Sequence, residues 1–471
     1  MIISDSISQR LRSGTATVIG FGISNKPLVK YLLDMGVKVT VRDAKSAEAL
    51  GDEYEEYSSQ GVRFILGENY LDGICEDVIF RSPGVRPDSG SIPDAVKNGS
   101  LLTSEMEWFL SITPAYVIAV TGSDGKTTTT TLIFKLLQEE YANSNRNVYV
   151  GGNIGRPLLS DAKQMKSTDF AVVELSSFQL QNLTSPIDRA VITNITPNHL
   201  NWHTDMEEYT NAKLKIYAGN KTELLTVNAN DERTRPAGFG FYGKKAFFSA
   251  RPLPSECVGC PDSRCLFLKD GIICVSENGI VSEILDTNII KLPGVHNVEN
   301  YMAAISATWG LVSLETVRKI ASTFGGVEHR LEFVRELNGV KYYNSSIDSS
   351  PTRTAAALSA LKTKPIVICG GYDKHIPFEP LAQALKERAK AVVLTGATRL
   401  AILDAIDSCE GFDKNAIPII VEENFENATK RAAAIAAPGD VVLLSPACAS
   451  FDAFTNFEVR GRTFKNIVNS L

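Results

Sequence analysis

The amino-acid sequence predicts an α/β protein of three domains, each built on a doubly wound, largely parallel sheet. The chain has 471 residues, which is too long for a single hydrophobic core. Three successive segments alternate short apolar runs with amphipathic stretches of helical period, the pattern of parallel sheets covered by helices. The first two segments also open with an apolar strand that runs directly into a glycine-containing turn.

Breaks in this pattern predict the domain boundaries. A proline-containing stretch, "SITP", interrupts the first segment just before the next apolar strand, "AYVIAVTG". A glycine pair near residue 325 follows the last helical stretch of the second segment and is typical of a linker. We therefore expect domains at residues 1–113, 114–325 and 326–471.

Composition limits the possible partners of this protein. The 48 Lys and Arg residues are outnumbered by 54 Asp and Glu, giving a net charge of −6, so no bulk positive field attracts nucleic acid or an anionic membrane. No apolar run approaches the roughly 18 residues of a membrane span, and the N-terminus lacks a signal-peptide core. We expect a cytoplasmic protein that binds small molecules and neither nucleic acid nor membrane.

The eight cysteines leave two interpretations open. Most lie in apolar, strand-like runs, as buried free thiols do in a reducing compartment. Cys257, Cys260, Cys265 and Cys274 lie close together, and the first two have the C-x-x-C spacing of a zinc site. The second half of this segment lacks the paired spacing of a zinc ribbon. We favour free thiols in an insertion without a catalytic role.

The stretch "VIAVTGSDGKTTTTTL" has the features of a phosphate-binding loop. Gly122 and Gly125 permit backbone conformations that turn N–H groups toward an anion, and the following helix adds its positive N-terminal end. Lys126 supplies a mobile charge, and the Thr127 hydroxyl is in the position of a magnesium ligand. Val120 stands where the strict P-loop pattern has its first glycine. This shortened variant predicts a nucleoside triphosphate site.

A second glycine turn lies near the N-terminus. The pattern Gly20-x-Gly22-x-x-Asn25, followed by Asp43 at the end of a predicted strand, resembles a dinucleotide fingerprint without its third glycine. Such a turn holds a phosphate or packs tightly, and nicotinamide binding is disfavoured because the chain already has another nucleotide site. With the later strand end "RSPGV", it predicts a crevice for the diphosphate of a ligand.

Three polar side chains follow consecutive elements near the phosphate loop. Glu174 ends an apolar strand, His199 follows the next strand, and Lys213 lies on the helix after it. We expect them to converge on one metal pocket. An ammonium group repels Mg²⁺, but a carbamate formed from Lys213 and CO₂ would be an anionic oxygen ligand. All five histidines follow apolar runs, which favours functional roles for them.

At this point the sequence is similar to a known family. The motifs "TGSDGKTT", "GGNIG", "ELSSFQL", "NITPNHLNWH", "NAKLKIY", "PGVHNVEN" and "EHR" resemble, in order and spacing, those of the Mur ligase family. The C-terminal "LLSPACASFDAFTNFEVRG" resembles the member that adds D-glutamate. The resemblance implies a Rossmann-like UDP-binding domain, a P-loop-type central ATPase domain and a Rossmann-like C-terminal domain. It also implies a monomer that joins D-glutamate to UDP-N-acetylmuramoyl-L-alanine through an acyl phosphate, in cytoplasmic peptidoglycan precursor synthesis.

The resemblance implies a role for each matching residue. Those expected around ATP are Gly122, Ser123, Asp124, Gly125, Lys126, Thr127, Thr128, Asn297, Asn300 and Arg330. Lys126, Glu174, His199 and a carbamylated Lys213 are the expected catalytic residues, and two Mg²⁺ are expected on Thr127, Glu174, His199 and Lys213. Those expected on the UDP substrate are Ile23, Ser24, Asp43, Gly84 and Asn153, and those around D-glutamate are Lys374, Ser450 and Phe457.

The chain departs from the family pattern at three positions. Ser345 replaces an aspartate expected near the ATP ribose, Ile347 replaces a lysine, and Asn198 replaces the aspartate before His199. We interpret these as variation within an active family. The alternatives are another ligase of the superfamily, similar to folylpolyglutamate synthetase, and a non-catalytic, nucleotide-dependent regulatory module. The C-terminal motif argues against the first alternative, and phosphate release that requires both substrates would exclude the second.

Overall fold

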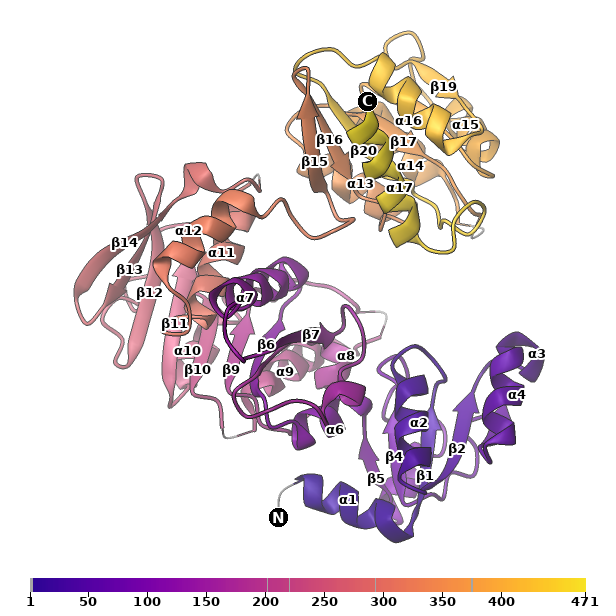
Figure 1. Ribbon diagram of the computed structural model, residues 1–471, viewed down its shortest axis with the longest axis vertical. Helices are drawn as coiled ribbons and strands as arrows, with labels where there is room; N and C mark the ends of the chain where they lie inside the picture. Colours follow the sequence, from indigo (N-terminus) through magenta and orange to yellow (C-terminus); the bar gives the residue numbers. More distant parts are fainter. Residues whose placement is uncertain (1–2, 201, 220, 293, 374–375) are drawn as a thin grey trace. The chain divides into compact units, whose positions relative to one another are not determined.

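A computed structural model describes residues 3–200, 202–219, 221–292, 294–373 and 376–471. It confirms the predicted α/β class, with three sheets flanked by helices (Figure 1). The chain divides into two compact units, Met1–Thr323 and Phe324–Leu471. The first unit holds two of the sheets and the second unit holds the third, and the domain boundaries at 113/114 and 325/326 stay predictions.

The first sheet is wholly parallel, with strand order β3-β2-β1-β4-β5. Its strands are β1 (Thr15–Ile19), β2 (Lys38–Asp43), β3 (Arg63–Leu66), β4 (Val78–Arg81) and β5 (Leu101–Thr103). Its helices are α1 (Ile3–Ser13), α2 (Asn25–Asp34), α3 (Ala47–Leu50), α4 (Asp52–Ser59), α5 (Ile92–Lys97) and α6 (Glu105–Ile112). The chain leaves β1 in one direction for β2 and returns on the other side to β4, and such a switch point forms a crevice at the carboxyl ends of the strands.

The second sheet has the strand order β14-β13-β12-β11-β10-β9-β6-β8-β7 and is parallel except for its β12–β14 meander. Its strands are β6 (Tyr116–Thr121), β7 (Val148–Gly152), β8 (Phe170–Glu174), β9 (Arg189–Ile192), β10 (Leu224–Asn228), β11 (Lys244–Ser249), β12 (Ser263–Lys269), β13 (Ile272–Glu277) and β14 (Ile280–Asp286). The buried apolar residues of β6, β8 and β9 form its centre, as expected for parallel strands covered on both faces.

Helices α7 and α11 pack against each other on this sheet (Figure 1). The helices of this part are α7 (Lys126–Glu140), α8 (Ser177–Leu180), α9 (Met206–Leu214), α10 (Arg235–Gly240), α11 (Val295–Ala307) and α12 (Leu314–Thr323), with single 3₁₀ turns at Leu159–Asp161, Lys215–Tyr217 and Thr287–Ile289. Threonine has low helix propensity, yet "TTTTT" opens α7. Thr129 and Thr130 are fully buried there, so tertiary packing holds this turn in the helix.

The third sheet has the order β15-β16-β20-β17-β18-β19 and is parallel apart from the β15–β16 hairpin. Its strands are β15 (Glu332–Leu337), β16 (Val340–Asn344), β17 (Ile366–Cys369), β18 (Ala391–Leu394), β19 (Ile419–Val421) and β20 (Val441–Leu444). Its helices are α13 (Pro351–Ala360), α14 (Glu379–Arg388), α15 (Arg399–Asp407), α16 (Phe425–Ala434) and α17 (Phe457–Ser470). Separate apolar clusters pack on its two faces.

The cysteine segment packs as part of the core. Cys257 and Cys265 belong to the large apolar cluster, and the Cys265 thiol donates to the Cys257 carbonyl at 3.2 Å. Burial raises the pKa of the Cys257 thiol to about 11 and that of Cys265 to about 12, so both are neutral. Across the described ranges, the one close group of three potential metal donors is Glu328, His329 and Glu332, where Lys465 already pairs with both carboxylates. These observations favour free thiols.

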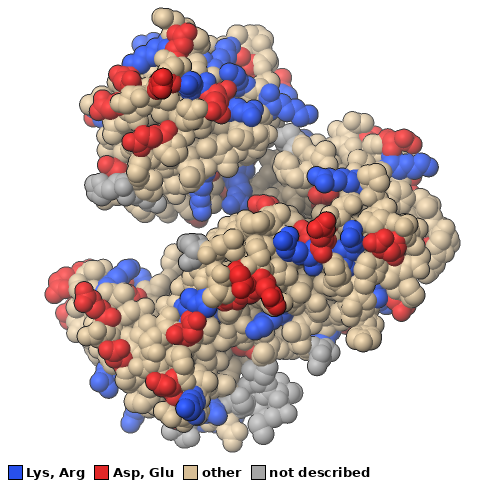
Figure 2. Space-filling model, turned by 180° about the vertical axis from the view of Figure 1, so that it is seen from behind, with Lys and Arg blue, Asp and Glu red and all other residues tan. Residues whose placement is uncertain are grey.

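Charges of both signs are mixed on the surface seen in Figure 2. On the described part of the face in Figure 2, Lys and Arg are interspersed with Asp and Glu, and no continuous basic surface covers it. None of the helices within the described ranges is both long and apolar enough to cross a bilayer.

A buried arginine joins the first sheet to the loop before β4. Arg42 on β2 is 1% exposed. Its guanidinium donates to the carbonyls of Tyr70, at 3.2 Å, and Asp72, at 2.7 Å, and faces the Glu76 carboxylate at 3.4 Å. These contacts replace the water that the guanidinium loses on burial.

We predict that Arg42→Met loosens the first sheet, because it leaves the Glu76 carboxylate buried without its partner. The local free energy of opening, measured by amide hydrogen exchange of β1 and β2, should fall by about 3 kcal/mol. The control is Arg63→Met on the neighbouring strand β3, where the side chain is exposed and the change should stay within about 0.5 kcal/mol. Equal hydrogen-exchange protection of β1 and β2 in the two variants would contradict this role of Arg42.

Candidate active site

The phosphate loop joins β6 to α7 and has no room for side chains at its two glycines. Gly122 has φ +149°, and a Cβ there would lie 1.8 Å from Thr193 Oγ1. Gly125 has φ +78°, and its Cβ would lie 2.3 Å from Asn300 Oδ1. Both positions therefore require glycine, because the backbone conformation and the close packing each exclude a larger residue.

Part of the loop is held by the end of the neighbouring strand β9. The Ser123 N–H donates to the Asn194 carbonyl at 2.8 Å, and the Asp124 N–H donates to Asn194 Oδ1 at 2.9 Å. These two N–H groups, which the sequence predicts to face an anion, are thus engaged within the protein. The first N–H groups of α7, from Lys126 onward, lack helical partners. The anion-binding capacity of the loop therefore lies at the start of α7.

The side chains around the loop agree in part with the predicted ATP set. Lys126 folds back so that Nζ donates to the Ser123 carbonyl at 2.9 Å, and Thr127 and Thr128 are half-buried on the first turn of α7. On α11, Asn300 accepts from Thr129 Oγ1 at 3.2 Å and donates to Asn297 Oδ1 at 3.1 Å. The structure brings both asparagines beside the phosphate loop.

Glu174 is a buried carboxylate at the carboxyl end of β8. Its Oε1 accepts from Asn153 Nδ2 at 2.7 Å, while Oε2 is buried with no hydrogen-bond partner in the described structure. The backbones of Gly152 and Glu174 also pack closely together, since a Cβ on Gly152 would lie 2.2 Å from the Glu174 carbonyl oxygen. Asn153, which the sequence assigned to substrate, here orients Glu174 and leaves one oxygen available to a cation.

Lys213 on α9 is an amine buried beneath the phosphate loop. It is 1% exposed, its Nζ donates to the Gly122 carbonyl at 2.8 Å, and Nζ lies 4.7 Å from the centre of the Tyr209 ring. Burial, reinforced by the Lys126 charge, lowers the pKa of this amine to about 6, against an opposing contribution from Glu174. The amine is therefore mostly neutral at neutral pH.

His199 lies in the same region in a strained conformation. Its φ of +54° is left-handed, and its ring lies edge-on to Phe178 at 4.9 Å. The residue is exposed overall, but partial burial of its ring and the nearby charge of Lys126 lower the pKa of this imidazole, so a neutral nitrogen is available for a metal. The charge of Lys126 lowers the pKa of both His199 and Lys213, and Glu174 opposes the shift at Lys213. The convergence of Glu174, His199 and Lys213 on one metal pocket stays a prediction.

Two of the other histidines have structural contacts. The buried His203 pairs through Nε2 with Ser177 Oγ at 2.9 Å, and the buried His329 pairs through Nδ1 with Asn344 Nδ2 at 2.9 Å. A functional interpretation of every histidine is therefore not needed, because position after an apolar run does not distinguish a ligand from a satisfied core group.

The residues predicted to bind UDP lie at the carboxyl ends of the first sheet. Both oxygens of Asp43 are engaged by backbone N–H groups, those of Phe21 at 2.6 Å and Lys45 at 2.9 Å, so this carboxylate shapes the glycine turn. Ile23 is 80% exposed, and Ser24 precedes α2 at its N-cap position without a side-chain capping hydrogen bond. Gly84 lies in the loop after β4, at the same edge of the sheet.

In the second unit, the structure places part of the set predicted around D-glutamate. Ser450 is buried, its carbonyl accepting from the Phe454 N–H at 2.8 Å. Phe457 opens α17, with its carbonyl accepting from Ser346 Oγ at 2.8 Å. Arg330 is exposed in the loop before β15, and Lys374 lies outside the described residues.

One buried arginine of this unit was not predicted from the sequence. Arg460 on α17 is 2% exposed and donates to the carbonyls of Cys448 at 3.0 Å, Ala449 at 2.9 Å and Ser346 at 2.9 Å. It thereby holds the two loops that follow β16 and β20. Its position in "NFEVRG" was visible, but no local pattern distinguishes a buried arginine from a solvated one.

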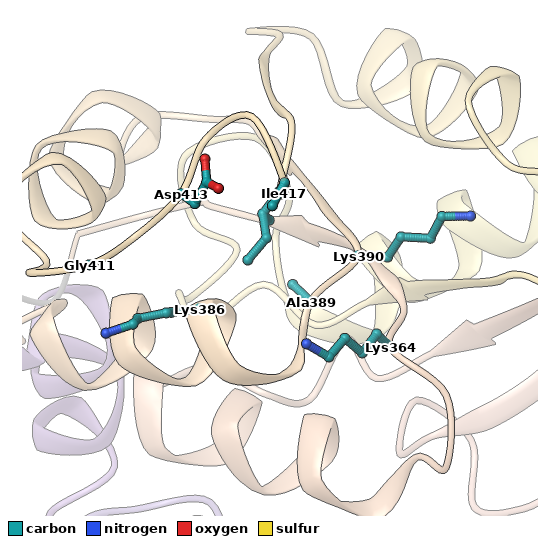
Figure 3. A pocket seen from close by; sticks show the side chains of 8 residues that line it. Lys364, Lys386, Ala389, Lys390, Gly411, Asp413 and Ile417 are labelled. Atoms are coloured by element: carbon teal, nitrogen blue, oxygen red, sulfur yellow. The ribbon is translucent and has the colours of Figure 1, made fainter.

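A cavity of about 440 Å³ lies at the opposite end of this sheet (Figure 3). Its lining includes Lys364, Lys386 and Lys390. Lys364 lies just before β17, Lys386 lies on α14, and Lys390 immediately precedes β18. Lys390 pairs with Asp440 at 2.6 Å, Lys386 donates to the Glu410 carbonyl at 2.7 Å, and their side chains point in opposite directions in Figure 3. The cavity holds none of the predicted site residues.

Comparison with known proteins agrees with this geometry. The model of the Mur ligase middle domain matches residues 120–251, and that of the Mur ligase, glutamate ligase domain matches residues 329–448. The chain therefore belongs to the Mur ligase family, and the expectation that it is a ligase is confirmed.

Relatives over the full length carry a more particular name. Proteins named UDP-N-acetylmuramoylalanine--D-glutamate ligase are 45% identical in Ruminiclostridium cellulolyticum, over 99% of both chains, and 46% identical in Clostridium novyi, over 98% of both. The protein of that name in Clostridium perfringens is 45% identical over 98% of both. Among solved structures, a murein peptide ligase from Psychrobacter arcticus matches at 18% identity and a TM-score of 0.46, over 96% of this chain and 99% of that one.

We predict that Gly125→Ala disrupts nucleotide binding, because the new methyl group would overlap Asn300. The affinity for a non-hydrolysable ATP analogue, measured by calorimetry, should fall about tenfold or more. Gly36→Ala is the control: Gly36 has φ +76° but open space around its Cβ position. That variant should lose stability and keep its affinity, whereas unchanged affinity in Gly125→Ala would contradict the packing argument.

Proposed function

We propose that this chain uses ATP to join the amino group of D-glutamate to the carboxylate of UDP-N-acetylmuramoyl-L-alanine, in cytoplasmic peptidoglycan precursor synthesis. The observation that carries the proposal is 45% identity, over 99% of both chains, to a protein of that named activity. The Lys213 amine, which donates to the Gly122 carbonyl of the phosphate loop, and the nearby charge of Glu174 support it. A folylpolyglutamate synthetase-like ligase and a non-catalytic module are disfavoured by the full-length relatives.

The chemistry requires the carboxylate to be activated before the amine attacks. Hydroxide or oxide is a very poor leaving group, whereas transfer of the ATP γ-phosphate to the carboxylate gives an acyl phosphate from which phosphate leaves readily. The start of α7 and Lys126 would hold the phosphates of ATP and stabilise the charge that develops during transfer. The D-glutamate amine then attacks the acyl carbon, and phosphate departs as the amide forms.

The donor set fits the predicted Mg²⁺. The buried, unpartnered Oε2 of Glu174, the hydroxyl of Thr127 and the neutral imidazole of His199 would hold two Mg²⁺ together with Lys213. When bound, Mg²⁺ would neutralise the phosphate oxygens and polarise the reacting phosphoryl group. Carboxylate and other oxygen donors are the usual preference of this ion.

The surroundings of Lys213 fit a carbamate. Its amine is buried, contacts a carbonyl and an aromatic ring, and lies under the influence of a second cation, Lys126. A neutral amine attacks CO₂ to give a carbamate anion and one proton, which would replace a repelled ammonium group with an oxygen ligand. The Gly122 carbonyl would hold the nitrogen of Lys213 in place, and Asn153 would orient the neighbouring Glu174 carboxylate.

The substrate residues complete the proposal. The UDP group would lie at the carboxyl ends of the first sheet, near Ile23, Ser24, Asp43 and Gly84, and D-glutamate near Lys374, Ser450 and Phe457. Arg330 would act on the γ-phosphate. Ser345 accepts from the Leu331 N–H at 3.1 Å, so this departure from the family pattern has a structural contact. We propose that the enzyme acts as a monomer.

The proposal is tested by coupling phosphate release to substrate addition. Release from ATP should require both UDP-N-acetylmuramoyl-L-alanine and D-glutamate, and in an amino-acid panel L-glutamate and D-alanine should not replace D-glutamate. Release with ATP alone would support a nucleotide-driven module instead. Release with a folate and L-glutamate would support the other ligase class.

We predict that Lys213→Ala loses most of the ligase activity and regains part of it with added short carboxylic acids, because a free carboxylate can occupy the space of the lost carbamate. Product formation in acetate or formate titrations measures the rescue. The control is Lys215→Ala, an exposed lysine two positions along the chain, which should keep its activity and gain nothing from the acids. Full activity of Lys213→Ala without additives would refute the carbamate.

A further inference from the structure

One tryptophan touches both the loop predicted to hold the diphosphate of the substrate and the turn that carries His199. The Trp202 indole N–H donates to the Gly84 carbonyl at 3.1 Å. The guanidinium of Arg86, from the same loop, lies over the indole ring, 4.9 Å from its centre. Two short loops that are far apart in the sequence are thus joined through one side chain.

The backbone of Trp202 fixes the conformation of His199. The N–H groups of Trp202 and His203 both donate to the His199 carbonyl at 3.0 Å. A left-handed conformation at a histidine persists only where surrounding contacts hold it. The position of Trp202 therefore determines whether the His199 turn keeps the geometry seen in this structure.

A second set of contacts runs beside the first. Arg81, at the end of β4, donates to the Pro83 carbonyl at 3.2 Å and to the Phe178 carbonyl at 3.0 Å. The Phe178 ring packs on Trp202 at 4.6 Å and on His199 at 4.9 Å. Arg86 also pairs with Glu208, at the start of α9, at 3.3 Å. A movement of the loop at residues 82–86 is consequently transmitted to the His199 turn by packed side chains.

We propose that Trp202 is a positioning residue that couples the two sites, so that binding of a nucleoside diphosphate at the first sheet sets the position of His199. This inference rests on the proposed function, which places UDP beside Gly84. It extends that function by making the catalytic histidine respond to the UDP end of the substrate as well as to the reacting carboxylate at its other end. The ligand needed is the UDP group alone, which has no carboxylate that could contact His199 directly.

The test uses the full chain with ¹³C-labelled histidine and UDP as the probe. Five histidines give few imidazole signals, and His199→Gln identifies the one from His199. In the wild-type protein, UDP should shift the His199 signal without Mg²⁺ or nucleotide triphosphate present. In Trp202→Phe, which keeps an aromatic ring but lacks the indole N–H donor, the shift should fall about twofold or more, while UDP affinity changes less than about threefold.

The matched control is Trp309→Phe, the same substitution at a tryptophan that also lies against an arginine, Arg264, at 4.6 Å. That variant should retain the wild-type shift. Arg86→Lys is a second test variant, because it keeps the positive charge but loses the planar contact with the indole, and it should also reduce the shift.

The outcomes separate this inference from the proposed function. UDP that binds without moving the His199 signal, or a shift that is unchanged in both Trp202→Phe and Arg86→Lys, would overturn the coupling and leave the ligase activity standing. Failure of UDP to bind the wild-type protein would overturn the UDP site of the proposed function, and the coupling with it.

Discussion

The geometry of the site depends on how closely the phosphate loop packs against its neighbours. At Gly122 and Gly125, the hydroxyl of Thr193 and the amide of Asn300 occupy the volumes that side chains would need. This contact fixes the loop between β9 and α11 before any ligand binds. Preorganised donors are the main source of electrostatic stabilisation in enzymes, since they need not reorganise when charge develops. Lys213 contacts the same loop, since its amine donates to the Gly122 carbonyl.

Burial also sets the charges at the site. Lys213 lies beneath the loop and Glu174 lies at the end of β8, both almost inaccessible to water. The positive charge of Lys126 and the loss of water favour a neutral amine at Lys213, while Asn153 satisfies only one oxygen of Glu174. The second oxygen of Glu174 is thus buried without a hydrogen-bond partner in the described structure. Such incomplete pairing is costly to a fold and typical of functional sites.

The sequence allowed the fold class and the main parts of the site to be predicted, because they depend on local patterns. Glycine spacing located the loop, and chain order placed Glu174, His199 and Lys213 after consecutive elements. Contacts between distant segments were not predictable in this way. The use of loop N–H groups by Asn194, the hold of Asn153 on Glu174 and the burial of Arg460 each depend on tertiary packing that leaves no local signal. The structural contacts of His203 were missed for the same reason.

The central claim is that the chain activates a carboxylate by transferring phosphate to it. The most direct measurement follows ¹⁸O from the carboxylate of labelled UDP-N-acetylmuramoyl-L-alanine during turnover with ATP and D-glutamate. If an acyl phosphate forms, one labelled oxygen bridges carbon and phosphorus and leaves with the phosphate, so mass spectrometry should find ¹⁸O in the inorganic phosphate. Unlabelled phosphate, released while amide is formed, would contradict the account.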